Sequence, residues 1–154
     1  MDKISNHISI AESTRSNTAA RLGISNIPDG DTINNMRKVA EEVFEPLREW
    51  VGEPIKINSF YRSPDLNTAI GGSKKSQHCK GQAIDIDDTY CSATNAEMFT
   101  YIKNNLDFDQ LIWEFGDASN PDWVHVSYVS PEKNRNRILT ASKDNNGKTV
   151  YSIV

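Results

Sequence analysis

The order of elements in the sequence predicts an α+β fold, in which helices flank a small, largely antiparallel sheet. Up to about residue 106 the chain gives helical and strand patterns in the order helix, strand, helix, strand, helix. The remaining residues add strand patterns with no helix between them, unlike a doubly wound parallel sheet. The 154 residues fit a single domain, with a lead-in segment over 1–30, a core over 31–130 and a C-terminal hairpin over 131–154.

The lead-in segment is polar and mixed. Its apolar residues, around 8–11 and 19–22, favour a short helix or a segment that packs on the core. Residues 26–30, NIPDG, have the composition of a turn.

Apolar residues spaced three and four apart predict a helix from about residue 31 to residue 51. Asp31 or Thr32 can cap its start, since a side-chain oxygen there accepts a hydrogen bond from a free amide group. Pro46 lies inside the pattern and lacks an amide hydrogen, so we expect a kink or a split after Phe44. The apolar stripe itself indicates core packing.

Capping residues and alternating patterns predict the remaining helices and strands. Ser63 and Pro64 have the pattern of a cap and the first residue of a short helix, and Ser92 can cap a helix over 93–106. Alternation of apolar and polar residues predicts strands at 55–62, 108–114 and 123–129, and a hairpin over 137–154.

Composition limits the classes of function. With 37% apolar and 25% charged residues the chain resembles ordinary globular proteins, and its net charge of −4 argues against a nucleic-acid-binding protein. Its two cysteines are too few for a disulfide scaffold. No apolar run reaches the ~18 residues of a membrane span, and the N-terminus lacks the apolar centre of a signal peptide. We therefore expect a monomer that is made in the cytoplasm and does not insert into membranes.

The segment over residues 76–87, SQHCKGQAIDID, combines a histidine with several carboxylates. After Gly81 it alternates like a strand, with Asp85 and Asp87 on one face and two isoleucines on the other. A buried carboxylate needs a partner, and the nearby His78 suggests a metal ion. Gly81 is the expected bend between the histidine and the strand.

A third metal ligand could come from the strand predicted over 123–129, where His125 shares a face with Trp123. A lone histidine on a strand is more often structural. Two histidines and an aspartate, however, match the donors that zinc prefers. Three protein ligands would leave a fourth position open for water, as in catalytic zinc sites: His78, Asp85 and His125.

Hydrolysis at such a site also needs a base and a cation. Asp122, at the start of the strand that carries His125, could be the base, and so could Glu114 at the end of the neighbouring predicted strand. Arg62, at the end of the first predicted strand, is the candidate cation. Its position alone favours an ordinary surface ion pair.

Other residues have simpler interpretations. His7 lies in the polar lead-in and is expected to be exposed and inert. Cys79 follows His78, and thiolate binds zinc strongly, but on an extended segment it would point away from the histidine. Asp87 shares the face of Asp85 and could replace it or support it.

Residues 76–85 resemble the S-x-H-x-x-G-x-A-x-D signature of the zinc D-Ala-D-Ala carboxypeptidase family, which also contains D-Ala-D-Ala dipeptidases and phage L-alanoyl-D-glutamate endopeptidases. The resemblance continues, in the family's order, through residues 59–64 (SFYRSP), 108–114 (FDQLIWE) and 122–125 (DWVH). It covers roughly residues 30–130 and implies the hedgehog-like fold of these peptidases.

The resemblance also implies a role for each matched residue. The ligands of one zinc ion would be His78, Asp85 and His125. Asp122 would be the general base on the water, and Arg62 would bind the substrate carbonyl and stabilise the oxyanion. Four more residues would contact substrate or support the ligands: Ser76, Tyr61, Glu114 and Trp123.

By this resemblance the chain would be a zinc metallopeptidase that hydrolyses peptidoglycan stem peptides with a zinc-activated water. It could cut the D-Ala-D-Ala bond as a carboxypeptidase or the L-Ala-D-Glu bond as an endopeptidase. A carboxypeptidase would need a cation for the terminal carboxylate of its substrate, and the candidates are Lys74, Lys75 and Lys80. It resembles compact phage or prophage endolysins, which reach the cell wall by phage-type release or on a virion. The alternative is an inactive, zinc-stabilised wall-binding or virion structural module, although such a module needs neither base nor arginine.

Overall fold

A six-stranded sheet runs through the protein in the strand order β3–β4–β6–β5–β7–β8. It is described from a computed structural model, which covers residues 3–154. The strands are β3 (Lys56–Ser59), β4 (Ala83–Asp87), β5 (Gln110–Glu114), β6 (Trp123–Ser127), β7 (Arg137–Lys143) and β8 (Thr149–Ile153). Neighbouring strands pair antiparallel except β5 and β7, which are parallel. The expected α+β class with a largely antiparallel sheet is confirmed.

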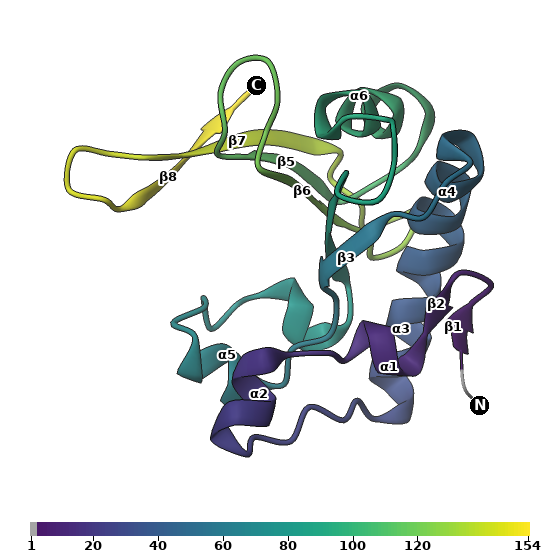
Figure 1. Cartoon of the computed structure of the whole chain (residues 1–154), viewed down its shortest axis with the longest axis vertical. Helices are drawn as coiled ribbons and strands as arrows, with labels where there is room; N and C mark the ends of the chain where they lie inside the picture. Colours follow the sequence, from purple (N-terminus) through teal and green to yellow (C-terminus); the bar gives the residue numbers. More distant parts are fainter. Residues whose placement is uncertain (1–2) are drawn as a thin grey trace.

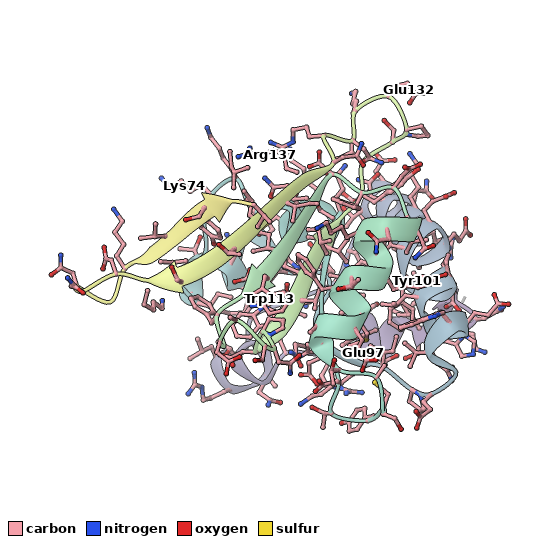
Figure 2. All side chains as sticks on the ribbon, turned by 90° about the horizontal axis from the view of Figure 1, so that it is seen from above. Lys74, Glu97, Tyr101, Trp113, Glu132 and Arg137 are labelled. Carbon is pink, nitrogen blue, oxygen red and sulfur yellow. The ribbon has the colours of Figure 1, made fainter. Side chains whose placement is uncertain are left out.

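Helices cover one face of this sheet (Figure 1). A long helix runs as α3 (Gly30–Val39), the π-helical turn η1 (Ala40–Phe44) and α4 (Glu45–Val51), and α6 (Asn95–Asn105) packs beside α4. In Figure 2 the view from above shows α6 next to the strands, with Tyr101 on the helix and Trp113 on β5. The ring of Trp113 meets that of Phe99 edge-on, with 5.2 Å between centroids. This layer contains the main core.

The main core joins the apolar side of the strands to the apolar stripes of the helices. Its strand residues alternate with polar ones, as predicted, and its helix residues recur every three or four positions. The central members are Ile84, Ile86, Val124, Val126, Met36, Val39, Phe44, Leu47, Met98 and Ile102. The opposite face of β4 and β6 is therefore left for polar side chains.

Pro46 explains the π-helical turn in the long helix. A proline has no amide hydrogen and crowds the preceding turn, so a regular α-helix cannot run through it. The widened turn over residues 40–44 directly precedes α4, which begins at Glu45 with Pro46 in its first turn. The predicted split after Phe44 is confirmed.

Two predicted helix caps are wrong. The long helix is capped by Asp29, whose Oδ1 accepts the Thr32 amide at 2.8 Å, rather than by Asp31 or Thr32. Likewise α6 is capped by Thr94, not Ser92. Thr94 Oγ1 accepts the Glu97 amide, and the Glu97 carboxylate accepts the Thr94 amide, which forms a capping box. In both cases several polar residues compete locally, and the turn conformation decides between them.

The lead-in segment contains a short hairpin, β1 (Lys3–Ser5) with β2 (Ile8–Ser9), followed by α1 (Ile10–Ser13) and α2 (Asn17–Leu22). Ile4 and Ile8 are buried in the main core, so the expected packing of this segment is confirmed for the part that the structure describes; its first two residues lie outside that part. The hairpin was not predicted because strands of two or three residues are too short to show alternation.

Two short helices flank the central segment: α5 (Pro64–Ala69), capped by Ser63 as predicted, and the 3₁₀ turn η2 (Gln77–Lys80). The β7–β8 hairpin projects away from the helices (Figure 1). Across residues 3–154, no helix combines the length and apolar character that a membrane crossing requires.

Candidate metal centre

Three potential metal ligands meet where η2 lies against the paired strands β4 and β6. His78 comes from η2, while Asp85 and His125 face each other across the two strands in register. One ligand atom from each residue lies within 4.8 Å of the other two. The structure thus brings together the three residues that the sequence predicts as ligands. They lie on the polar face of the sheet, away from the main core.

Hydrogen bonds orient both imidazole rings. His78 Nδ1 lies 2.8 Å from the Phe60 carbonyl oxygen, which can only accept, so Nδ1 carries the hydrogen and Nε2 is left for a metal. His78 Nε2 is 3.1 Å from Asp85 Oδ2, and His125 Nδ1 is 2.9 Å from Asp85 Oδ1. A carbonyl that fixes the second ring nitrogen is usual behind metal-bound histidines. Two imidazoles and one carboxylate fit zinc and leave a coordination position open.

The charge state of Asp85 suits a metal ligand. Burial of the carboxyl opposes ionisation, but His78 and His125 outweigh it and hold the pKa of Asp85 well below its ordinary value. The ionised form, which binds metals, is therefore present at neutral pH.

The loop that carries His78 is built by local contacts. Ser76 caps η2, and its Oγ accepts the His78 amide at 3.3 Å. Gly81 then adopts a left-handed conformation, with φ of 71°, and its amide donates to the His78 carbonyl. A side chain at Gly81 would place its Cβ 2.7 Å from the Thr32 carbonyl oxygen, so only glycine fits. The predicted bend at Gly81 is confirmed.

Comparison with known families identifies the family of the chain. The family model described as peptidase M15 matches residues 6–127, which is most of the chain and includes every residue of the candidate centre. The chain belongs to the peptidase M15 family. Members are zinc-dependent metallopeptidases that act on peptidoglycan, so this protein is a zinc peptidase, and the His-Asp-His group suits its cofactor. No curated protein matches the chain.

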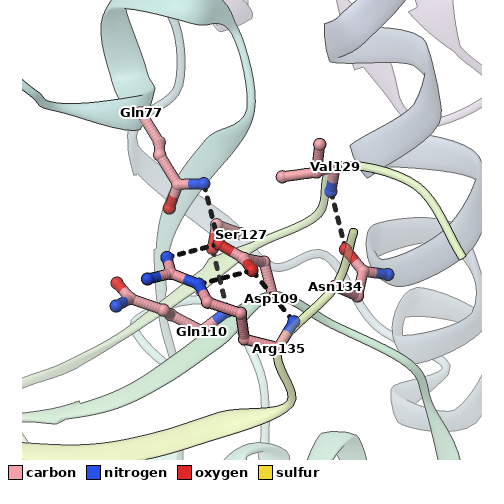
Figure 3. Close-up of polar contacts among 7 residues, drawn as sticks. All are labelled: Gln77, Asp109, Gln110, Ser127, Val129, Asn134 and Arg135. Atoms are coloured by element: carbon pink, nitrogen blue, oxygen red, sulfur yellow. Dashed lines mark hydrogen bonds and ion pairs between the residues drawn. The ribbon is translucent and has the colours of Figure 1, made fainter. Parts of the chain in front are cut away.

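An ionic network around the buried carboxylate of Asp109 anchors the histidine loop of this M15 peptidase (Figure 3). Asp109, which precedes β5, accepts a hydrogen bond from Gln77 Nε2 at 2.9 Å and two from the Arg135 guanidinium at 2.8 and 2.9 Å. It also accepts the Arg135 amide at 3.0 Å. Burial opposes ionisation of this carboxyl, but the bonds from Arg135 and Gln77 lower the pKa of Asp109. Since Gln77 adjoins His78, the network links the metal loop to the sheet.

Arg62 and Tyr61 of the peptidase follow β3 and line a groove that reaches Asp85. The Arg62 backbone amide donates to the His78 carbonyl at 3.2 Å. Its side-chain Nε is buried and has no hydrogen-bond partner among the described residues. Tyr61 is buried, and that burial raises the pKa of its phenol. Both residues thus line the groove that reaches the candidate centre.

The two candidate bases of the peptidase differ in their surroundings. Glu114 ends β5 on the same sheet face as His125 and is only 7% exposed. Burial raises the pKa of Glu114 to about 7; His125 opposes the rise and Asp85 adds to it. Asp122 is exposed and donates its backbone amide to the Glu114 carbonyl at 2.9 Å. Trp123 is half-buried between them and packs against Phe115.

The remaining candidates lie apart from the three ligands. Cys79 and Cys91 are both free thiols, and the metal-ligand group does not include Cys79. Asp87 is buried, and its Oδ1 accepts hydrogen bonds from the amide and hydroxyl of Thr89, so a local turn occupies it. His7 is exposed as expected, and it pairs with Glu45 rather than standing alone.

Proposed function

We propose that this M15 peptidase cuts peptidoglycan stem peptides, at the D-Ala-D-Ala or the L-Ala-D-Glu bond, with zinc held by His78, Asp85 and His125. The observation that carries the proposal is the convergence of their ligand atoms within 4.8 Å on the polar sheet face. The Phe60 carbonyl supports it, because it leaves His78 Nε2 free for the metal. Zinc, when bound, polarises the peptide carbonyl and makes water a stronger acid.

Arg62 is the candidate for stabilising the charge that develops on the peptide carbonyl oxygen. Its buried Nε has no partner among the described residues, and a buried donor without a partner is unfavourable until something accepts from it. The groove is lined by both Arg62 and Asp85, so a carbonyl that reaches the centre would lie near the Arg62 guanidinium. A fixed donor of this kind stabilises an oxyanion more than it stabilises the neutral substrate.

We assign proton transfer to Glu114, with Asp122 as the competing assignment from the family resemblance. Glu114 is buried on the sheet face that carries His125, and its pKa of about 7 suits a group that takes a proton from water and returns it to the leaving amine. Asp122 lies in a bend just before the first residue of β6, and its side chain is exposed. Its backbone is fixed there by Glu114 and by Asn95 Nδ2, which donates to the Asp122 carbonyl.

The test compares Glu114→Gln with Asp122→Asn during digestion of purified peptidoglycan. Mass spectrometry of the released muropeptides reports both the activity and the bond cut, and metal analysis reports zinc. We expect Glu114→Gln to keep zinc and lose about 10²–10⁴-fold in kcat, with a much smaller loss for Asp122→Asn. The reverse pattern would assign the base to Asp122.

Two controls complete the test. A chelator should abolish wild-type activity, and added zinc should restore it. A wild-type protein that holds zinc and releases no muropeptide would support the inactive binding or structural module instead. Delivery to the wall by phage-type release or on a virion stays a prediction.

A further inference from the structure

A groove of about 380 Å³ runs from the candidate metal centre along β3. Asp85 and Arg62 lie at one end, and all four residues of β3 contribute to its wall. Successive side chains of a strand point to opposite faces, so a groove bordered by four consecutive residues follows the edge of the strand. β3 is the first strand in the sheet order, so this is the edge that the sheet leaves unpaired.

The walls of the groove are positively charged although the protein is acidic overall. Three cations line it: Arg15, Lys56 and Arg62. Of the described residues in its lining, Asp85 is the one acid, and it belongs to the candidate metal centre. The chain as a whole carries a net charge of −4, so this local excess of positive charge opposes the general trend.

Register places Lys56 along the groove from the metal ligand rather than directly opposite it. Ser59 pairs with Asp85, while Lys56 pairs with Asp87, because β3 bulges between Ile57 and Ser59. Asp87 is two residues beyond Asp85 on β4, so Lys56 lies about 7 Å along the sheet from the register of the metal ligand, at about 3.3 Å per residue. An extended peptide bound at the centre would reach Lys56 after about two residues. Arg15, from the segment between α1 and α2, lines the groove as well.

We propose that an extended, anionic segment of the substrate peptide binds along the free edge of β3 and places its carboxylates against Arg15 and Lys56. The edge offers backbone hydrogen bonds to an added strand, and the two cations select for carboxylates. This inference rests on the proposed peptidase function and names the part of the substrate that the groove recognises. Lys74, Lys75 and Lys80, which the sequence suggested for a carboxylate, do not line the groove.

The experiment measures kcat and KM for two synthetic stem peptides, one with free carboxylates and one with the same carboxylates amidated. The variants are Arg15→Ala, Lys56→Ala and their combination. Arg21→Ala and Lys133→Ala are matched controls, because both residues are exposed and neither lines the groove. Arg15→Lys keeps the charge and should restore most of the affinity.

With the free-acid peptide we expect KM to rise about fivefold for each single variant and about twentyfold for the double variant, with a smaller change in kcat. For the wild-type protein, KM should be higher on the amidated peptide than on the free-acid peptide by a similar factor. On the amidated peptide, the variants should have a KM close to that of wild type. The controls should match wild type on both peptides.

Two results would overturn the inference and leave the peptidase function intact. One is cleavage of both peptides by wild type with equal KM. The other is a fall in kcat without a rise in KM for Arg15→Ala and Lys56→Ala, which would indicate a structural role. If wild type cleaves neither peptide and no muropeptides are released from peptidoglycan, the proposed function itself fails, and this inference fails with it.

Discussion

Replacing Asp109 tests whether the ionic network beneath the histidine loop holds it in place. The Asp109 carboxylate is 2% exposed and accepts four hydrogen bonds, from Gln77 Nε2 and from the Arg135 amide, Nε and terminal nitrogen. Asp109→Asn keeps the shape of the side chain and removes its charge. Each of its two oxygens accepts two of these bonds, and one oxygen becomes an NH₂ group that faces donors, so two bonds are lost and the others weaken.

The magnitude follows from burial. Removing one partner of a fully buried ion pair costs about 3–5 kcal/mol. Arg135 is about half exposed, with a side-chain exposure of 49%, so water can recover part of its hydration. We therefore expect Asp109→Asn to lower the free energy of unfolding by about 2–3 kcal/mol, equivalent to a fall in Tm of about 4–12 °C.

Urea unfolding at pH 7, with chelator present so that metal binding does not add to stability, measures this loss. Asn134→Ala is the control within the same region (Figure 3), because it removes one neutral hydrogen bond, from the Val129 amide at 2.8 Å. The control should cost about 1 kcal/mol or less. If the two variants lose the same free energy of unfolding, the ionic network around Asp109 stabilises the protein no more than a single neutral hydrogen bond does.

The pH dependence gives a second check on the same variant. Because the pKa of Asp109 is lowered in the folded state, its ionised form stabilises the fold above the unfolded pKa of about 3.9. That contribution is lost as pH falls through the folded pKa. The stability difference between wild type and Asp109→Asn should be constant from about pH 5 to 7 and shrink below about pH 4.

Three further substitutions test local structure. Gly81→Ala should destabilise the protein by about 3 kcal/mol, because the left-handed φ and the close Thr32 carbonyl oxygen both oppose a Cβ. Thermal unfolding measures this loss of stability. A loss under about 1 kcal/mol would contradict the prediction. Thr94→Ala should cost about 1 kcal/mol through loss of the α6 cap, whereas Ser92→Ala should cost little. Equal losses at Thr94 and Ser92 in urea unfolding would mean that the capping box adds nothing.

Much of the fold was predictable because its signals are local. Alternation along β4 and β6 assigns their faces, so Ile84 and Val124 enter the core while Asp85 and His125 share the other side. The Ser63-Pro64 start of α5 and the break at Pro46 also follow from single residues. The N-terminal hairpin and the caps at Asp29 and Thr94 were missed, because competing polar residues and very short strands leave no clear pattern.

The three candidate ligands, the bend at Gly81 and the α+β class could all be predicted from the sequence, because residue types, their spacing within strands and turns, and the order of the elements carry these signals. The surroundings of the ligands became clear only in the folded structure. In the folded chain Glu114 is buried on the sheet face of the ligands, whereas Asp122 is exposed. Gln77 donates a hydrogen bond to Asp109, and Arg15 and Lys56 line the same groove. These contacts join segments that are distant in sequence, and burial and charge in such contacts depend on the assembled chain.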